Sequence, residues 1–273
     1  MPPLPFTLIS LDLDLTFLDE HLRISPRNLQ AVRRCRALGV RFVINSGRMH
    51  CTTLPYWREM GLDTPVISYN GACIRYEDTG EELQHLRLDA DTTREIVDFC
   101  DAEGLHLNYY RDDTLYIAKK DRWSELYATR TSAALIPVGD LHRVLDRRPT
   151  KMLVVDEPER VAALYPRLRD RYAGRAYVTT SNCEYLEFIP LDADKGKALA
   201  RVAAHYGVPR EQVIAFGDAR NDVPALRWAG MGVAVANACP EALAAAARLA
   251  PHHNEDGVAV ALEEIFGLEP EQV

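Results

Sequence analysis

Short apolar runs that end at charged or polar residues recur near both ends of the chain. Near the N-terminus, the run at 6–14 ends in carboxylates, and the runs at 41–48 and 65–72 end in polar turns. Between the first two runs, the Ser-Pro pair at 25–26 is typical of a helix start, and apolar positions at helical spacing continue to Gly39. This alternation of strands with a helix predicts a parallel sheet with helices on its faces.

The same pattern returns in the last third of the chain. Apolar residues recur at helical spacing over 195–206, and Gly207 ends that helix. Apolar runs at 213–218 and 232–237 predict two more buried strands, the first of which ends in an acid. The alanine-rich segment 241–249 predicts a packed helix.

The middle of the chain, from about residue 83 to 189, follows a different pattern. Helical periodicity alternates there with pairs of short apolar segments, which is typical of an α+β unit with an antiparallel sheet. The expected elements are, in chain order, helix 91–103, strands 105–110 and 114–118, helix 121–132, strand 151–156, helix 157–172, and strands 175–180 and 184–189. The sequence therefore predicts an α/β protein whose Rossmann-like parallel-sheet core, 1–82 and 190–273, carries an inserted α+β domain at 83–189.

The composition is that of an ordinary globular protein: of 273 residues, 47% are hydrophobic and 26% are charged. This length suits about two domains, at roughly 150 residues each. The formal net charge of −8 makes nucleic acid and anionic membrane surfaces poor partners. No apolar run approaches the ~20 residues of a membrane span. A small anionic ligand stays compatible with this charge, because a metal ion or a few local cations can hold it.

Six cysteines are spread along the chain without a CxxC pair, which favours neither a zinc ribbon nor a disulfide scaffold. They predict reduced, mostly buried thiols in a protein of the cytosol. The N-terminus lacks both the basic start and the long apolar stretch of a signal peptide. We therefore expect a cytoplasmic location.

Four acids follow predicted strands. Asp12 and Asp14 lie two residues apart at the end of the first strand, so their side chains point to the same side. Asp218 and Asp222 follow the strand at 213–218. Carboxylates this close repel each other unless a cation or a proton lies between them, and ligands collect beyond the carboxyl ends of parallel strands. The four acids therefore predict an oxygen site of the kind that Mg²⁺ prefers. The simpler alternative is a set of separate turn or helix-capping acids.

Four short motifs carry this candidate chemistry, and they occur in a definite order: DLDLT at 12–16, NSGR at 45–48, DKGKAL at 194–199 and GDARND at 217–222. In this order they resemble the motifs of haloacid dehalogenase superfamily phosphatases of the Cof type, over nearly the whole chain. One position departs from the family, which usually has glycine where Leu15 stands. The family carries a large αβ cap between its second and third motifs, which is where 83–189 is inserted here. Such a cap would close over the site and limit water.

The resemblance implies a magnesium-dependent phosphatase that acts on a small phosphorylated metabolite, such as a sugar phosphate or a phosphorylated cofactor. It makes Asp12 the nucleophile that forms an aspartyl-phosphate. It makes Asp14 the general acid for the leaving alcohol and then the base for the attacking water. Asp12, Asp218 and the backbone carbonyl of Asp14 would bind Mg²⁺.

The resemblance also implies which residues bind the phosphate. Ser46, Gly47 and Asn221 would contact phosphate oxygens, with help from the backbone N–H groups of a following helix. Lys195 would neutralise charge on the nucleophile and on the transferred phosphoryl group. Asp222 and Asn221 would orient the groups around the metal or its waters, so Asn221 is predicted in both roles.

Several alternatives stay open at this point. Lys197 competes with the lysine two residues before it, and Arg48 either pairs with an acid or touches the substrate. Asn70 and Asn237 are expected to be turn residues. At the level of function, a phosphoryl transferase or mutase on the same scaffold is one alternative, and a non-catalytic sensor phosphorylated on Asp12 is another. We expect a monomer or a homodimer.

Overall fold

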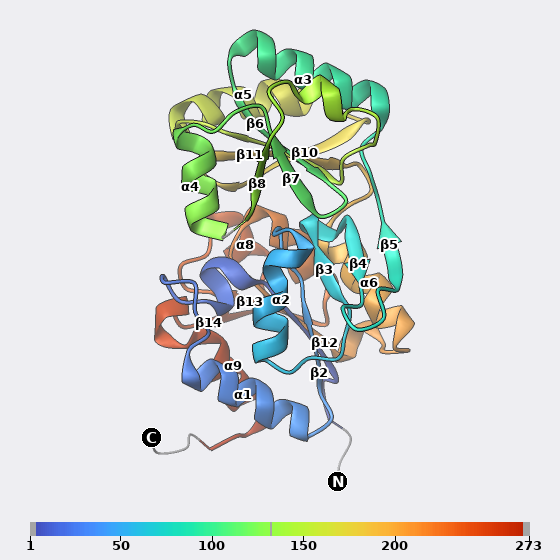
Figure 1. Cartoon of the computed structure of the whole chain (residues 1–273). Helices are drawn as coiled ribbons and strands as arrows, with labels where there is room; N and C mark the ends of the chain where they lie inside the picture. The colour runs from blue at the N-terminus through green and yellow to red at the C-terminus, as the bar shows by residue number, and fades with distance from the viewer. Residues whose placement is uncertain (1–3, 132, 270–273) are drawn as a thin grey trace.

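A five-stranded parallel sheet forms the centre of the lower domain in Figure 1, and both ends of the chain contribute to it. The computed structural model describes residues 4–131 and 133–269. The strand order is β14-β13-β12-β1-β2. The strands are β1 Leu8–Leu11, β2 Arg41–Ile44, β12 Val213–Gly217, β13 Met231–Val235 and β14 Arg248–Ala250. Their carboxyl ends meet along one edge of the sheet, where ligands collect in folds of this kind.

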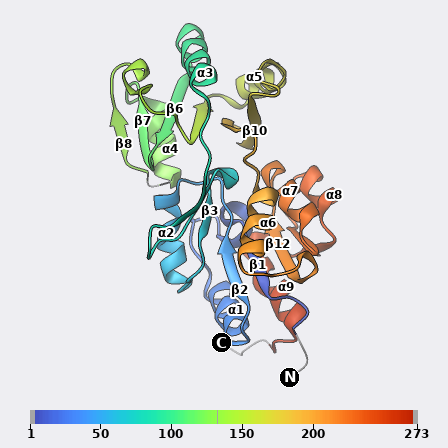
Figure 2. The ribbon, with the colours of Figure 1, turned by 90° about the vertical axis from the view of Figure 1, so that its right-hand side faces the viewer.

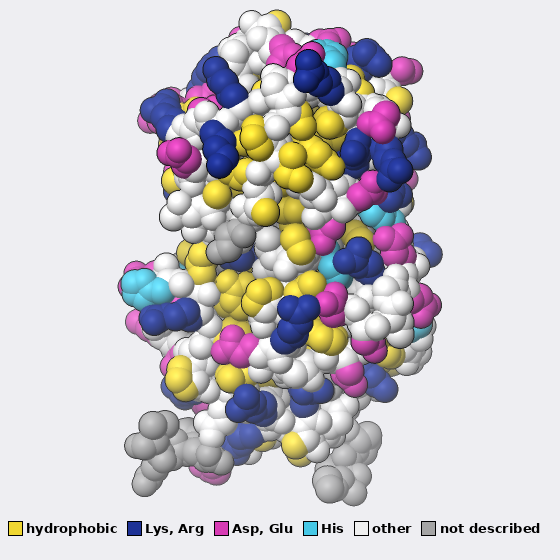
Figure 3. All heavy atoms as spheres, viewed as in Figure 1, with side chains coloured by type: hydrophobic (Ala, Val, Ile, Leu, Met, Phe, Trp, Pro, Cys, Tyr) yellow, Lys and Arg dark blue, Asp and Glu magenta, His cyan; other side chains and the backbone are white. Residues whose placement is uncertain are grey.

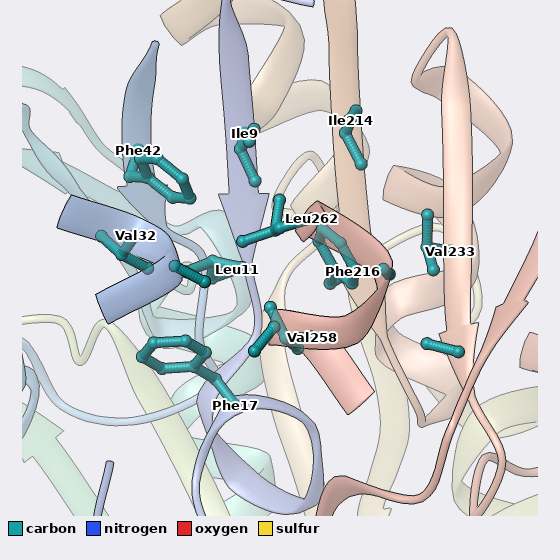
Figure 4. Close-up of a cluster of buried hydrophobic side chains, with 14 of the residues drawn as sticks. Ile9, Leu11, Phe17, Val32, Phe42, Ile214, Phe216, Val233, Val258 and Leu262 are labelled. Atoms are coloured by element: carbon teal, nitrogen blue, oxygen red, sulfur yellow. The ribbon is translucent and has the colours of Figure 1, made fainter. Parts of the chain in front are cut away.

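Helices cover both faces of this core sheet. They are α1 Pro26–Ala37, α2 His50–Glu59, α6 Lys195–His205, α7 Val223–Trp228, α8 Pro240–Ala245 and α9 Gly257–Phe266. Because alternate strand residues point to opposite faces, Ile9 packs with Val32 of α1 and Leu262 of α9 (Figure 4). Leu8 packs on the other face with Leu199 of α6. All five side chains are buried, and each contributes roughly 1.5–3 kcal/mol of hydrophobic free energy.

A six-stranded, mostly antiparallel sheet forms the upper domain, in the order β10-β11-β9-β6-β7-β8. Its elements are α3 Ala90–Glu103, β6 His106–Arg111, β7 Thr114–Ile117, α4 Arg122–Thr131, β8 Leu135–Pro137, β9 Lys151–Val155, α5 Pro158–Arg171, β10 Ala176–Asn182 and β11 Tyr185–Pro190. Helices α3 and α5 pack on the sheet's outer face. On the inner face, Tyr127 of α4 packs in one cluster with Tyr110, Leu153 and the core residue Tyr69. This inner face is therefore the one turned toward the core sheet.

A small antiparallel sheet lies at the junction of the two domains (Figure 2). It consists of β3 Val66–Ser68, β4 Cys73–Arg75 and β5 Glu82–His85. The chain passes from β5 up into α3 and returns from β11 down into α6. Two chain segments therefore connect the domains.

The predicted fold class, an α/β parallel-sheet core with an inserted α+β domain, is confirmed. The boundaries at 1–82, 83–189 and 190–273 stay a prediction.

The segment 65–72 was expected to be one more strand of the parallel sheet, and this is wrong for most of it. Only Val66–Ser68 is extended, and it pairs antiparallel with β4. A single parallel bridge, Asn45 to Ile67, joins it to the end of β2. Tyr69 and Asn70 have φ of 53° and 56°, so the backbone turns back at once into β4. This reversal is a backbone feature that the apolar pattern does not reveal.

The predicted helix at 241–249 is also shorter than expected. Helix α8 ends at Ala245, and residues 248–250 form strand β14, parallel to β13. Without β14, the backbone groups of β13 would lack hydrogen-bond partners along that edge, and unpaired buried backbone groups are costly. This long-range pairing outweighs the helix propensity of alanine.

All six cysteines are free thiols. Cys35, Cys73 and Cys100 are buried, whereas Cys51 and Cys183 are exposed and Cys239 is half-buried. The expectation that most would be buried is therefore wrong for half of them. Within residues 4–131 and 133–269, no helix combines the length and hydropathy that crossing a bilayer requires.

Candidate active site

Asp12 lies directly after β1, at the carboxyl edge of the core sheet. Its backbone N–H donates to the carbonyl of Phe216 at 3.2 Å, so the pairing of β1 with β12 continues up to this residue. Leu15 then turns the chain with φ of 57°. Asn237 holds this turn, because its Nδ2 donates to the Leu15 carbonyl at 2.8 Å. The turn leaves Asp12 and Asp14 on the wall of one cavity.

Three buried carboxylates meet at this edge. Asp12, Asp218 and Asp222 each have an oxygen within 4.8 Å of the others. Lys195 Nζ donates to Asp12 Oδ1 at 2.6 Å and to Asp222 Oδ1 at 2.5 Å, and its side chain is 1% exposed. Thr16 Oγ1 donates to Asp218 Oδ1 at 2.9 Å. Residues separated by about 200 positions in sequence thus form one charged cluster.

The electrostatics of this cluster favour a bound cation. Burial raises the pKa of Asp12 to about 7, with a further rise from the charge of Asp222, and Lys195 opposes both effects. Burial and the charge of Asp12 also raise the pKa of Asp218. Burial of Lys195 favours its neutral amine, but the contacts of this side chain with the Asp12 and Asp222 carboxylates raise its pKa. One ammonium therefore does not balance three carboxylates, and a divalent cation would keep them ionised. The donors are all oxygen atoms, which suits Mg²⁺.

Asp222 is fixed by the loop that follows β12. Its Oδ2 accepts the backbone N–H of Asp218 at 3.1 Å and that of Ala219 at 3.0 Å. Its other oxygen faces Lys195. Asp222 therefore orients both the loop that carries Asp218 and the buried ammonium group.

The first residue of α6 is the lysine that belongs to the cluster. Asp194 caps this helix, with its Oδ1 accepting the N–H of Lys197 at 2.5 Å. Lys195 points into the cluster, whereas the Lys197 ammonium lies at the surface, 3.3 Å from Asp192. A β-carbon at Gly196 would lie 2.6 Å from the carbonyl of Pro224, so glycine allows α6 to approach α7 closely.

Arg48 pairs with an acid, which confirms one of the two alternatives left open by the sequence, and it also lines the cavity. Its Nε donates to Asp14 Oδ2 at 2.8 Å and its Nη2 to Oδ1 at 2.5 Å. The Arg48 side chain is 6% exposed, whereas that of Asp14 is 44% exposed. Such a two-point contact fixes the orientation of a carboxylate. The arginine thus presents Asp14 toward the open cavity.

The NSGR segment forms a tight turn after β2. Ser46 is fully buried, and its Oγ accepts the backbone N–H of Arg48 at 3.1 Å. Its hydroxyl hydrogen is therefore still available to a ligand. A β-carbon at Gly47 would lie 2.8 Å from Asn70 Oδ1, so the close approach of these two residues requires glycine.

A hydrogen-bond network links this turn to the inserted domain. Asn221 Nδ2 donates to Asn70 Oδ1 at 2.8 Å, and Asn70 Nδ2 donates to Glu187 Oε2 at 2.5 Å. Lys151 Nζ lies 3.4 Å from Glu187 Oε1 and donates to the Gly47 carbonyl at 2.8 Å. Asn70 is a turn residue, as expected, but it also connects the two domains. Asn221 Oδ1 is buried without a partner.

Replacing Lys151 with Met should lower the free energy of unfolding by roughly 3–5 kcal/mol, because the Glu187 carboxylate would stay buried without its cation. Both side chains are 2% exposed. Urea denaturation of each variant measures the effect. The double variant Lys151→Met/Glu187→Leu should recover part of the loss. The matched control is Lys197→Met, which removes a surface pair and should change stability by less than about 1 kcal/mol. A loss below about 1 kcal/mol for Lys151→Met would contradict this assignment.

A cavity of about 460 Å³ lies between the two domains, and Asp12 and Asp218 of the acid cluster form part of its wall. The core contributes Asp12, Asp14, Leu15, Gly47, Arg48, Asp218 and Asn221 to its wall, and the inserted domain contributes Tyr127, Arg130, Lys151, Ser181, Tyr185 and Glu187. Polar, cationic and aromatic groups from the inserted domain therefore face the acids across the cavity. This volume suits a small metabolite.

Sequence reasoning missed the residues that the inserted domain brings to the cavity. Tyr185 and Glu187 lie in the EYLEFIP segment at 184–190, which resembles the family but gave neither residue a role. Lys151 had a weak signal, because it is a charged residue at the start of the apolar run 152–155. Arg130 had none, since a charged residue on an amphipathic helix is ordinary.

Comparison with known proteins agrees with this geometry. Residues 9–262 match the model of a family described as haloacid dehalogenase-like hydrolase. The chain is 31% identical over 268 residues to the 5-amino-6-(5-phospho-D-ribitylamino)uracil phosphatase YitU of Bacillus subtilis, with 96% of this chain and 98% of that protein covered. It is 27% identical over 244 residues to the HMP-PP phosphatase of Serratia proteamaculans, with 86% of each covered. The crystal structure of a haloacid dehalogenase-like hydrolase from Bacteroides thetaiotaomicron superposes with a TM-score of 0.87 at 29% identity, over 96% of this chain and 100% of that one.

Proposed function

The chain belongs to the haloacid dehalogenase-like hydrolases and is a phosphatase of phosphorylated metabolites, and on that premise we propose that its reaction requires Mg²⁺ and proceeds through an aspartyl-phosphate on Asp12. The observation that carries this proposal is the buried contact of Asp12 with Lys195 beside Asp218, at the wall of the interdomain cavity. A carboxylate there is held against a cation and faces the space where a phosphate ester fits.

In the first half of the reaction, a carboxylate oxygen of Asp12 attacks phosphorus and the bond from phosphorus to the ester oxygen breaks. Asp14 gives its proton to the departing alkoxide. In the second half, water attacks the same phosphorus and gives a proton to Asp14, which releases the carboxylate of Asp12 and inorganic phosphate. The contact with Arg48 keeps Asp14 at the cavity wall, and one Asp14 oxygen must leave the guanidinium to carry the proton.

Asp12, Asp218 and the backbone carbonyl of Asp14 would hold Mg²⁺, which would offset the repulsion between the anionic nucleophile and the anionic phosphate. Asp222 orients this group of ligands through its bonds to the Asp218 loop and to Lys195. The all-oxygen donor set and the raised pKa values of the buried acids support this assignment.

The proposed donors to the phosphate oxygens are Gly47, on the cavity wall, and the buried residues Ser46 and Lys195 behind it. Ser46 offers its hydroxyl hydrogen, because its oxygen already accepts from Arg48. Lys195 offers its ammonium group, and Gly47 offers backbone on the cavity wall. The partnerless atom of Asn221 is an acceptor, Oδ1, which suits a metal-bound water better than a phosphate oxygen. This supports the predicted role of Asn221 in orienting metal-bound water over its predicted contact with phosphate.

The leaving group lies under the inserted domain. Tyr127 and Tyr185 present aromatic rings there, and Arg130 presents a guanidinium group. This lining suits a sugar phosphate or a phosphorylated cofactor, whose polar or planar groups can bond to cations and stack on rings. The similarity to YitU, whose name describes the phosphate ester of a ribityl chain on a uracil, supports the same class.

Product analysis tests the proposed reaction against its alternatives. With p-nitrophenyl phosphate and Mg²⁺, and without an acceptor, we expect many turnovers and one inorganic phosphate for each nitrophenol released. A transferase or mutase would stop after one nitrophenol per chain and would continue only when a second hydroxyl substrate is supplied. A sensor would become phosphorylated once and stop, so a single turnover would overturn the proposal.

Replacing Leu15 with Gly should change substrate preference more than the basic rate of hydrolysis. The Leu15 side chain is 49% exposed on the cavity wall, and its backbone has a φ that glycine adopts freely. Removing it takes an apolar contact away from the leaving group and relieves about 1–2 kcal/mol of backbone strain. The measurement is kcat/KM across a panel of phosphate esters, with Leu249→Gly, at an exposed site on β14, as the control. An unchanged order of substrates would contradict this role.

The partner of this enzyme is a small phosphorylated metabolite, and we place the reaction in the cytoplasm. The six free thiols support that location, because reducing compartments keep cysteines in this form. The oligomeric state, monomer or homodimer, stays a prediction.

A further inference from the structure

A second, smaller cavity of about 110 Å³ lies at the junction of the domains, and it shares no lining residue with the active-site cavity. Its wall includes Cys73 of β4, Glu82 and His85 of β5, and His50 at the start of α2. Figure 3 shows histidine, acidic and basic side chains gathered to the right of centre, at the height where the two domains meet. The phosphatase reaction proposed above uses none of these four residues.

We propose that this cavity binds a zinc ion through Cys73, Glu82, His85 and His50. One ligand atom each from Cys73, Glu82 and His85 lies within 4.8 Å of the other two. Tetrahedral ligands at zinc distances are separated by roughly 3.3–3.8 Å, so a small contraction brings these three ligands onto one ion. His50 lines the same cavity but lies outside this set, so it must move toward the ion to become the fourth ligand. A donor set of sulfur, nitrogen and oxygen selects Zn²⁺ over Mg²⁺, which prefers oxygen alone. The proposal is independent of the proposed function.

His50 is the independent observation that points to a ligand. Its side chain is fully buried, yet neither ring nitrogen has a hydrogen-bond partner. Glu77 Oε2 lies 3.8 Å from Nε2, which is too far for a hydrogen bond, and Arg58 already holds Glu77. Because neither ring nitrogen contacts an acceptor that could stabilise a charge, the buried ring is neutral. A neutral imidazole is the form that binds metals.

His85 has the hydrogen-bond arrangement of a metal-binding histidine. Its Nε2 lies 2.9 Å from Thr150 Oγ1, and its Nδ1 lies 3.0 Å from Glu82 Oε1. If Nε2 donates to the threonine, Nδ1 carries a lone pair that accepts from Arg87 Nη2 at 3.1 Å, so a bound metal ion would have to displace this guanidinium from Nδ1. Metal-binding histidines commonly donate their second nitrogen to an oxygen in this way.

The charges around the cavity permit a cation. Arg75 lies 3.9 Å from Asp113, and Arg87 lies 3.4 Å from Asp112 and 3.1 Å from His85 Nδ1. Asp112 also pairs with Arg147 at 3.2 Å, so two arginines share this carboxylate, whereas the Glu82 carboxylate pairs with His85. When zinc binds, Cys73 forms the zinc–sulfur bond as a thiolate and its proton goes to the buffer.

Cobalt substitution tests the proposal on the full chain, with Mg²⁺ in excess to occupy the active site. One equivalent of Co²⁺ should produce the near-ultraviolet band of a thiolate–cobalt bond and the intense visible bands of tetrahedral cobalt, and Zn²⁺ should displace it. Cys73→Ser should abolish the thiolate band, whereas Cys35→Ser, at an equally buried thiol outside the cavity, should keep it. His85→Gln should weaken Zn²⁺ binding by at least about 10-fold.

The spectrum of the wild-type protein with Co²⁺ is the first decisive measurement for the zinc site. Absence of a thiolate band from the wild-type protein would overturn the proposal, as would a band that persists in Cys73→Ser. Phosphatase turnover should be unchanged in Cys73→Ser, because this residue lies outside the catalytic cavity. Failure of the zinc site would thus leave the proposed function standing, and failure of that function would leave the zinc site standing.

Discussion

Asp12→Asn should reduce kcat by about 10⁴-fold or more, a loss of the size seen when an enzyme loses its nucleophile. The amide has nearly the shape of the carboxylate, but it cannot form the bond to phosphorus. The Lys195 ammonium still has Asp222 as a partner, so the buried cation is not left alone. Steady-state release of phosphate under saturating Mg²⁺ measures the loss.

The fold of this variant should be intact, because removing one carboxylate relieves repulsion among Asp12, Asp218 and Asp222. Circular dichroism and the midpoint of thermal unfolding check this. Asp192→Asn, at an exposed acid that pairs only with Lys197, should keep full activity. Activity of Asp12→Asn within about 10-fold of the wild type would exclude Asp12 as the nucleophile.

Removing the metal should have the second largest effect. Incubation with EDTA should abolish turnover, and added Mg²⁺ should restore it, because the buried acids hold more negative charge than Lys195 balances. The same binding should stabilise the fold. At 100 times its Kd, Mg²⁺ should raise the free energy of unfolding by about 2.7 kcal/mol.

Asp218→Asn provides the matched variant, since it removes one proposed ligand and leaves Asp12 and Lys195 in contact. It should lose the stabilisation by Mg²⁺ as well as the activity, and this readout does not depend on turnover. Full turnover in EDTA would exclude the metal from the reaction. Stabilisation of Asp218→Asn equal to that of the wild type would place the metal elsewhere.

Much of the fold could be predicted because buried residues recur along the chain with the period of the helix or strand that contains them. The helix that begins at Pro26 and the hairpin of β6 and β7 lie where apolar spacing and turn residues predict them. The pattern failed at 248–250, where strand pairing with β13 overrides alanine's preference for helix. It also failed after Ser68, where two residues of positive φ reverse the chain.

The candidate site could likewise be predicted only in part from the sequence. Asp12 and Asp14 could be singled out because two acids at a strand end are unusual, and the order of the motifs added Ser46 and Lys195. Nothing local indicated that Arg48 would hold Asp14 in a two-point contact. A lone arginine in a turn is compatible with many partners, and only the fold selects one of them.

The sequence by itself determined the parallel-sheet core, the inserted domain and the acids placed where strands end, because these depend on local spacing and residue type. Tertiary structure alone decided what surrounds them. It brought Lys195 against Asp12 across 183 positions and set Lys151 and Glu187 over the Gly47 turn. The physical reason is that burial, strand pairing and the interactions between charges depend on distances in space. These distances are set by the tertiary fold of the whole chain.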